Sequence, residues 1–411
     1  MTVSGIGLGY APDVADLLTF EDAQALVLGR TRALPGELVA IADAAGRVTG
    51  ALVAAAVDLP PFASSAMDGY AVRTADLPGR VPVVARIAAG RPAGRALEPG
   101  EAMEISTGGV VPAGADAVVP VEYVVSHDND EVEIADASTP GANIRPRGGD
   151  VAAGATVVPL GTRLGPAQIG AVAAAGIAEL LCVRRPRVAV LATGSELARP
   201  GEPLGPGQVY EANGLMLAAA LAAAGAEVER LPSVADDEEA HRAALLRGLE
   251  ADVLVTSGGV SVGPHDLVRT IEAELGVEEV FWRVAIRPGK PVSFGVRDAT
   301  LVFGLPGNPV SSLVGCELFV KPALRAMQGL AQPLPPLEQG RLLAPLRRNA
   351  ARDDFVRSRA YMTPAGVELE PVAGQESHMI VRAAAADALV HVPRGAGELD
   401  VGSRVGWLRL G

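Results

Sequence analysis

Between residues 186 and 327 the chain alternates short apolar runs with segments of helical length, and this alternation constrains its fold more than any other feature. Four runs predict strands, at 187–192, 227–231, 252–256 and 301–305, and three segments predict helices, at 214–224, 237–249 and 311–320. Strands that alternate with helices form a parallel sheet with helices on both faces. We therefore expect a doubly wound α/β domain.

The flanking regions have other patterns. Thr19, followed by Asp22 and apolar periodicity up to residue 28, predicts a capped helix, and we interpret residues 39–53 as an extension of this helical region. From residue 81 to 134 short apolar runs alternate with Gly and Pro, which predicts a small β-rich domain. Beyond the proline-rich stretch 333–336, strand-like runs predict a C-terminal β domain resembling a barrel.

These patterns predict four domains. Residues 168–175 look helical and are interpreted as rejoining the N-terminal helices across the β-rich insertion. The expected boundaries are 19–53 with 147–176 for a discontinuous helical linker domain, 54–146 for the β-rich insertion, 177–327 for the α/β domain, and 328–411 for the C-terminal β domain.

Composition excludes several classes of protein. A formal net charge of -13 and 3% aromatic residues disfavour a nucleic-acid partner, which needs positive charge and stacking surfaces. The longest apolar stretch, 169–183, contains Glu179 and is too short to span a membrane, and residues 1–18 do not resemble a secretory signal, so we expect a cytoplasmic protein. Cys182 and Cys316 lack metal-ligand spacing and are expected in the core.

Three predicted strands end in glycine-rich turns, TGSE at 193–196, SGGVSVG at 257–263 and PGNP at 306–309. A single such turn is more often an ordinary turn, but three at one sheet edge favour a site where backbone N–H groups converge on an anion. None is a Walker A or dinucleotide fingerprint. The turn residues expected to bind a ligand are Ser257, Gly258, Gly259, Ser261, Gly263, Pro306, Gly307, Asn308 and Pro309.

Charged side chains lie close to these turns in the sequence. Carboxylates beside an anionic substrate indicate a bridging divalent cation, and hard oxygen ligands favour magnesium. Asp237 is equally compatible with a helix cap, and Arg283 with a solvated strand face. Lys290 is one of only two lysines in the chain and lies in a rigid RPGKP turn, which favours anion binding. The charged candidates are Glu196, Asp237, Asp266, Arg283, Arg287 and Lys290.

The β-rich insertion holds a second polar cluster. Asp68 follows two serines in PPFASSAMDGY, Thr107 lies in EISTGG, and Asp150 ends RPRGGD. Each is also explained by a stabilised turn, so the sequence alone leaves their roles open.

In this order the motifs resemble the MoeA family of molybdopterin molybdenumtransferases, which is similar to the E domain of gephyrin. The matching stretches span nearly the whole chain: PPFASSAMDGYAVR, EISTGGVVPAGADAVVPVE, NIRPRGGDV, LATGSEL, TSGGVSVGPHD, FWRVAIRPGKP and GLPGNPVSS, with AGQESHM near the C-terminus.

This resemblance implies an elongated four-domain subunit in a homodimer, with a central domain similar to MogA and MoaB. It implies that adenylated molybdopterin and molybdate give molybdenum cofactor and AMP, with Mg²⁺ held by Asp266 and Glu196. Other cofactor-synthesis proteins and recipient molybdoenzymes are expected partners, and Arg287 and Ser311 are candidates for a molybdate pocket. The implied functional set is Asp68, Thr107, Asp150, Glu196, Asp237, Asp266, Arg283, Arg287 and Lys290.

The sequence departs from the family pattern at four positions. Ser195 stands where an acid is common, Gly149 where glutamate is common, and Arg283 and Arg287 where lysines are common. Arginine keeps the charge but replaces a point charge with a planar fork. The alternatives are an adenylyltransferase-like enzyme, a non-catalytic scaffold similar to gephyrin, and a preference for tungstate over molybdate.

Overall fold

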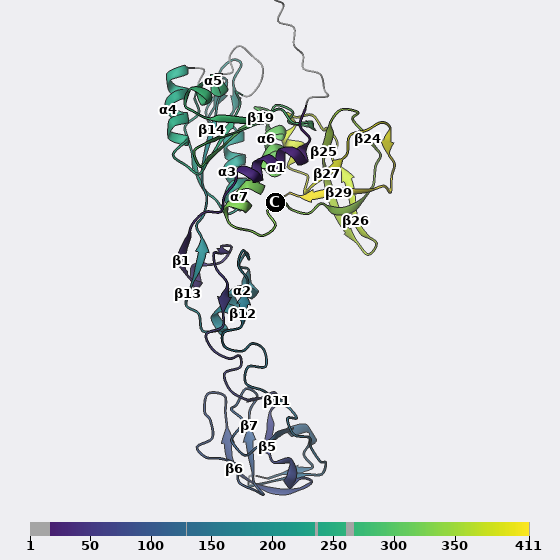
Figure 1. Cartoon of the computed structure of the whole chain (residues 1–411). Coiled ribbons are helices and arrows are strands. Elements are labelled where there is room, and N and C mark those ends of the chain that lie inside the picture. Colours follow the sequence, from purple (N-terminus) through teal and green to yellow (C-terminus); the bar gives the residue numbers. More distant parts are fainter. Residues whose placement is uncertain (1–16, 129, 235–236, 260–266, 411) are drawn as a thin grey trace, which may run out of the picture. The chain divides into compact units, whose positions relative to one another are not determined.

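In the computed structural model the described residues are 17–128, 130–234, 237–259 and 267–410, and they divide into two compact units (Figure 1). The first unit contains residues 1–37 and 183–411, and the second contains residues 38–182. Each unit is described by itself below.

A six-stranded sheet forms the centre of the first unit, in the order β17-β14-β18-β22-β21-β19. The first four strands are parallel, and two antiparallel strands that the sequence analysis did not identify complete the sheet. The predicted parallel strands are confirmed to within one residue at each end. The bounds are β14 Arg187–Ala192, β17 Glu227–Arg230, β18 Val253–Ser257, β19 Glu278–Trp282, β21 Ser293–Arg297 and β22 Thr300–Leu305.

Helices cover both faces of this sheet. Val188 and Val190 of β14 lie in a core that contains Leu217 of α3, whereas Ala189 and Leu191 lie in a second core with residues of α4 and α5. Successive side chains of a strand point to opposite faces, so both faces are buried and the doubly wound prediction is confirmed. The helices are α1 Phe20–Arg30, α3 Asn213–Ala223, α4 Glu238–Gly248, α5 Leu267–Glu274, α6 Pro309–Gly315 and α7 Lys321–Met327, with a π-helical turn Cys316–Val320 before α7.

The N-terminal helix is capped as predicted. The Thr19 hydroxyl accepts a hydrogen bond from the Asp22 amide at 3.0 Å, and buried Phe20, Ala23 and Val27 pack in the core of the first unit. The predicted helical extension over residues 39–53 is wrong, because this segment forms short strands and one 3-10 turn.

The second unit consists mainly of small sheets. A six-stranded sheet in the order β8-β5-β7-β6-β10-β9 confirms the β-rich insertion, and α2 Pro166–Ala174 belongs to the same unit. The strands are β1 Gly36–Ala40, β2 Val48–Thr49, β3 Val53–Ala54, β4 Ser64–Ser65, β5 Gly69–Val72, β6 Gly79–Ile87, β7 Ala102–Ile105, β8 Ala117–Pro120, β9 Ser126–His127, β10 Glu131–Ile134, β11 Ile144–Arg145, β12 Thr156–Val158 and β13 Glu179–Val183.

The C-terminal region forms a closed barrel, as its strand pattern predicted. Strands β25-β26-β23-β29-β27 follow one another, and β27 pairs again with β25. Trp407 is fully buried in the barrel core. The bounds are β23 Glu338–Leu342, β25 Asp353–Thr363, β26 Gly366–Pro371, β27 Ala388–Val392 and β29 Arg404–Arg409, with β24 Leu346–Arg347, β28 Glu398–Leu399 and α8 Ile380–Ala383 beside them.

Both cysteines are buried in the protein interior, as predicted. Among the described helices, none has the length and apolar character needed to cross a bilayer. The division into four domains, finer than the two compact units, stays a prediction.

A buried carboxyl group lies on α5. Glu272 is 7% exposed, and its Oε1 has no hydrogen-bond partner among the described residues. Burial, with a smaller contribution from the nearby Glu279 carboxylate, raises the pKa of Glu272 to about 8. A cavity of about 200 Å³ adjoins this side chain. Folding therefore keeps a proton on Glu272 over a pH range in which an exposed glutamate is ionised.

We predict that Glu272→Gln weakens the pH dependence of stability. Because the pKa of Glu272 is raised in the folded protein, its contribution to stability is fully present below about pH 4.5, where the carboxyl group is protonated in both the folded and the unfolded protein. This contribution is lost as pH rises towards 8. Urea unfolding gives the free energy of unfolding of both proteins at about pH 5 and about pH 8.5. Between these two pH values, the free energy of unfolding of the variant should rise relative to that of the wild type by on the order of 3 kcal/mol. Parallel pH profiles for the two proteins would contradict the burial of an unpaired acid at this position.

Candidate active site

A cavity of about 620 Å³ lies at the carboxyl ends of β14, β18 and β22. The turns after β14 and β22 and the last residue of β18 contribute to its wall, together with the start of α3 and two residues of the C-terminal region. Five residues predicted from the sequence are therefore brought together, namely Glu196, Ser257, Gly307, Asn308 and Pro309. The other lining residues are Ala192, Thr193, Leu197, Val209, Tyr210, Glu211, Ala212, Asn213, His378 and Ile380.

Two glycines let the first two turns approach closely. A Cβ on Gly258, whose φ is +100°, would lie 2.6 Å from the Thr193 carbonyl oxygen. A Cβ on Gly259, whose φ is +67°, would lie 2.4 Å from a methyl carbon of Val268. Such distances exclude any side chain, so glycine is required here for close packing as well as for its backbone angles.

The backbone N–H groups of the turns are not equivalent. The Gly258 amide donates to the Leu305 carbonyl at 3.0 Å and closes the sheet edge. Among the described residues, the amides of Gly259, Gly307 and Asn308 have no acceptor. These N–H groups are donors that the turns can offer to an anion.

Asn213, which the sequence analysis missed, connects two of the turns. Its side-chain amide donates to Ser257 Oγ at 2.9 Å and to the Gly307 carbonyl at 2.7 Å. Ser257 Oγ also lies 3.1 Å from Ser312 Oγ, and the Ser312 hydroxyl donates to the Pro306 carbonyl at 2.7 Å. Asn213 directly precedes the helix predicted at 214–224, where an asparagine commonly serves as a cap, so only the fold reveals this bridge.

Carboxylates flank the cavity from the turn after β14 and from the start of α3. Glu196 is exposed and lines the cavity, and a Cβ on Gly194 would lie 2.4 Å from its Oε2, so glycine leaves room for this carboxylate. Glu211 is 5% exposed and accepts a hydrogen bond from the Gly214 amide at 2.6 Å. Glu196 therefore faces solvent in the cavity, whereas Glu211 is engaged in capping α3.

Asp237 lies outside the cavity lining. Its Oδ1 accepts the Ala240 amide at 2.8 Å, which makes it the N-cap of α4, the alternative role that the sequence left open. Ser261, Gly263 and Asp266 fall outside the described residues.

The three predicted cations have different surroundings. The RPGKP turn packs against the start of α6, since a Cβ on Gly289 would lie 3.4 Å from the Ser311 carbonyl oxygen. Arg287 contacts the buried Asp354 carboxylate at 2.5 Å, and β20 (Ile286–Arg287) pairs with β25 of the barrel. Burial raises the pKa of Asp354, and the charge of Arg287 opposes that shift. Within the described residues, Lys290 and Arg283 have no ion-pair partner.

The second unit holds the remaining candidates. The Thr107 amide donates to Asp68 Oδ1 at 2.7 Å, so the loop before β5 and the turn after β7 bring these two predicted residues together. Asp150 is exposed in another turn, and its amide donates to the Leu59 carbonyl at 2.8 Å.

No group of three or more His, Cys, Asp or Glu side chains within the described ranges could hold a metal ion by itself. A metal at this site would need oxygen ligands from a bound substrate or from water in addition to protein carboxylates.

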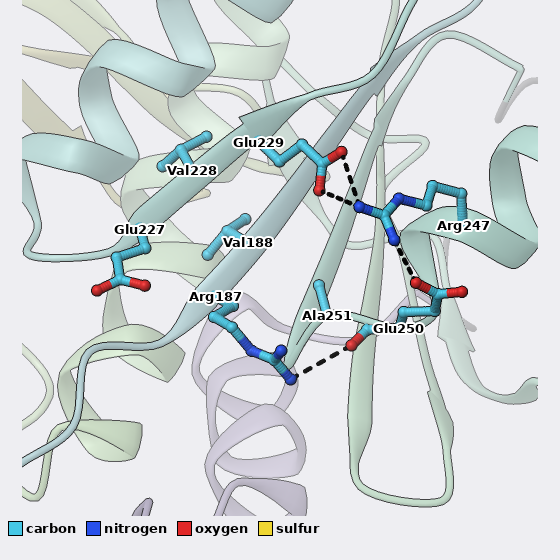
Figure 2. Close-up of a pocket in the computed structure, with 8 residues that line it drawn as sticks. All are labelled: Arg187, Val188, Glu227, Val228, Glu229, Arg247, Glu250 and Ala251. Atoms are coloured by element: carbon cyan, nitrogen blue, oxygen red, sulfur yellow. Dashed lines mark hydrogen bonds and ion pairs between the residues drawn. The ribbon is translucent and has the colours of Figure 1, made fainter. Parts of the chain in front are cut away.

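A smaller groove of about 270 Å³ lies at the opposite, amino end of β14 and β17, and Figure 2 shows the side chains of Glu229 and Glu250 directed toward Arg247. Arg247 pairs with Glu229 and Glu250, and Arg187 donates to the Glu250 carbonyl at 3.4 Å. Because Arg247 is engaged by two carboxylates of the groove itself, it offers little to an anionic ligand.

Comparison with known families covers most of the chain. Residues 18–176 match the MoeA N-terminal region (domains I and II), residues 189–326 match a probable molybdopterin binding domain, and residues 339–410 match the MoeA C-terminal region (domain IV).

Similar proteins cover nearly the full length. Molybdopterin molybdenumtransferase 2 of Mycobacterium tuberculosis H37Rv is 40% identical over 94% of this chain and 98% of its own. The Haemophilus influenzae molybdopterin molybdenumtransferase is 34% identical over 90% and 92%, respectively. A crystal structure of a Pyrococcus horikoshii MoeA protein superposes with a TM-score of 0.80 at 32% identity, covering 95% of this chain and 98% of that one. The chain belongs to the MoeA family.

Proposed function

We propose that this protein is a molybdopterin molybdenumtransferase that inserts molybdenum from molybdate into adenylated molybdopterin and releases AMP. Family membership supports this reaction. The observation that carries the proposal is the cavity at the sheet edge, where three turns meet and Asn213 joins two of them.

The cavity has the features required to bind a phosphate-bearing substrate. The unused amides of Gly307 and Asn308, two lining residues, are donors for phosphate oxygens, and Gly259 adds a further unused amide in the turn after β18. Lys290, which lies in the turn packed against α6, adds a positive charge. Preorganised donors and a fixed cation stabilise the charge that develops on the departing AMP phosphate as the phosphoanhydride breaks.

Glu196 and Asp266 are proposed to hold Mg²⁺. Glu196 fits this role because its carboxylate is exposed in the cavity and Gly194 leaves space beside it. Magnesium in proteins commonly uses one or two carboxylates and completes its shell with substrate phosphates and water. When bound, the ion would supply positive charge to the phosphate oxygens.

Arg287 and Ser311 remain the proposed contacts for molybdate. Arg287 carries its guanidinium beside the buried Asp354, which fixes its direction but offsets part of its charge. Ser311 is 3% exposed and lies beneath the RPGKP turn. The pterin dithiolene supplies sulfur ligands to molybdenum, so the reaction requires no protein thiol.

A homodimer is proposed to complete the site. In this arrangement Asp68, Thr107 and Asp150 of one subunit would face the cavity of the other. The contact between Asp68 and the Thr107 amide supports a preorganised loop for this purpose. The homodimer, the cytoplasmic location and the protein partners in cofactor synthesis stay predictions.

We predict that Asp266→Asn and Glu196→Gln each abolish product formation in a purified reconstitution with adenylated molybdopterin, Mg²⁺ and molybdate. Each change removes a negative charge proposed to hold Mg²⁺ while keeping the size of the side chain. AMP release and molybdenum incorporation measure the outcome, and replacing molybdate with tungstate tests oxyanion preference. Glu202→Gln, in the same segment but outside this cavity, is the matched control.

Unchanged AMP release in both variants would remove the basis for the proposed metal site. Formation of adenylated molybdopterin from molybdopterin and ATP, without metal insertion, would instead indicate the adenylyltransferase alternative.

We predict that Asn213→Ala lowers kcat/KM by roughly 10- to 100-fold, because small displacements of positioning groups have effects of this size. The same change removes two side-chain hydrogen bonds, each worth about 1 kcal/mol, so the melting temperature should fall by only a few degrees. Thermal unfolding and AMP-release kinetics on the same preparation separate the two effects. Activity that falls only as much as the folded fraction would show that the bridge matters for stability alone.

A further inference from the structure

Two guanidinium groups lie over the indole ring of Trp282. Arg269, in the first turn of α5, stacks 4.1 Å from the ring centroid, and Arg283, the next residue in the chain, stacks at 3.7 Å. Both distances are well within the range of favourable cation–π contacts. Trp282 is the last residue of β19, so its ring fixes a cation at the point where the strand ends.

The two stacked arginines differ in what else they bind. Arg269 donates to both carboxylate oxygens of Glu279 at 2.9 Å, so its charge is neutralised locally. Arg283 makes no ion pair or side-chain hydrogen bond with the other described residues. Its guanidinium therefore lies against the ring and keeps its N–H donors for another ligand.

The backbone holds Arg283 in an unusual conformation. Its φ is +78°, a left-handed value that non-glycine residues rarely adopt. Its amide donates to the Val292 carbonyl at 2.9 Å, and the Val284 amide donates to the Lys290 carbonyl at 3.0 Å. The surrounding hairpin thus enforces a costly conformation that turns Arg283 onto the indole, a pattern that recurs at functional sites.

Arg283 lies at the same edge of the sheet as the cavity. Trp282 pairs with Ser293, Ser293 pairs with Gly304, and Gly304 pairs with Thr256 of β18. Trp282 and Thr256 are therefore separated by three strand spacings, which corresponds to roughly 14 Å. An elongated substrate with more than one anionic group could reach both the cavity and Arg283.

We propose that Trp282 is a positioning residue that holds the Arg283 guanidinium at the sheet edge to bind a second anionic, phosphate-type group of the substrate. This inference rests on the proposed function, because it assumes a substrate with separated anionic groups. A guanidinium held over an aromatic ring keeps N–H donors in a planar fork that matches oxyanions, which lysine cannot reproduce.

The first test uses inorganic pyrophosphate and the full-length protein. The chain has only two tryptophans, and Trp407 is fully buried, so a change in emission on ligand binding reports on Trp282. We expect a saturable change in the wild type at constant ionic strength and its loss in Arg283→Gln. Arg297→Gln, at the opposite end of β21, is the control for net charge and should respond as the wild type does.

The second test compares Trp282→Leu with Trp282→Phe by calorimetric titration of pyrophosphate and by AMP-release kinetics. Loss of the ring should weaken pyrophosphate binding and raise KM by about 3- to 30-fold with little change in kcat. Phenylalanine keeps an aromatic face and should recover most of the affinity. A merely structural role would not give this order or this separation of KM from kcat.

Two results would overturn the proposal: pyrophosphate binding unchanged in Arg283→Gln, or Trp282→Leu and Trp282→Phe impaired to the same degree. If Trp282→Leu does not fold, the fluorescence titration of Arg283→Gln decides alone. The titrations need no turnover, so they remain informative if the wild type fails to insert molybdenum, which would instead refute the proposed function.

Discussion

The register of β14, β18 and β22 is the constraint on which the site depends. Leu191 pairs with Thr256, and Thr256 pairs with Gly304, so the three strands end at the same level. The turn after β18 packs closely against Thr193 and Val268 because Gly258 and Gly259 lack side chains that would collide with them. The register of the sheet therefore determines where the cavity lies, and the polar side chains determine what it can bind.

Three further contacts set the chemistry of this edge. Asn213 ties two turns together, Asp354 fixes the direction of Arg287, and Trp282 supports Arg283. The positive groups of the RPGKP region are thus held by three different environments, namely a buried carboxylate, an aromatic face and a tight turn. Such preorganisation means that little rearrangement is needed when a charged substrate binds.

Much of this arrangement could be predicted from the sequence, because strand length, apolar runs and glycine-rich turns are local signals. The parallel strands, the capped first helix, the β-rich insertion and the C-terminal barrel were predicted correctly. The segment 39–53 was misread, since its short apolar stretches suit either a helix or strands and the pairing of β1 with the distant β13 decides between them. Asn213 and Asp354 were missed because their partners lie 44 or more residues away in the chain, and a long-range contact has no local signature.

Hydrogen–deuterium exchange with and without adenylated molybdopterin tests the central claim most directly. If the substrate binds where the three turns meet, amides after β14, β18 and β22 should become protected together, while the groove between Arg187 and Arg247 stays unchanged. Protection confined to that groove, or absent from the turns at saturating substrate, would contradict the account.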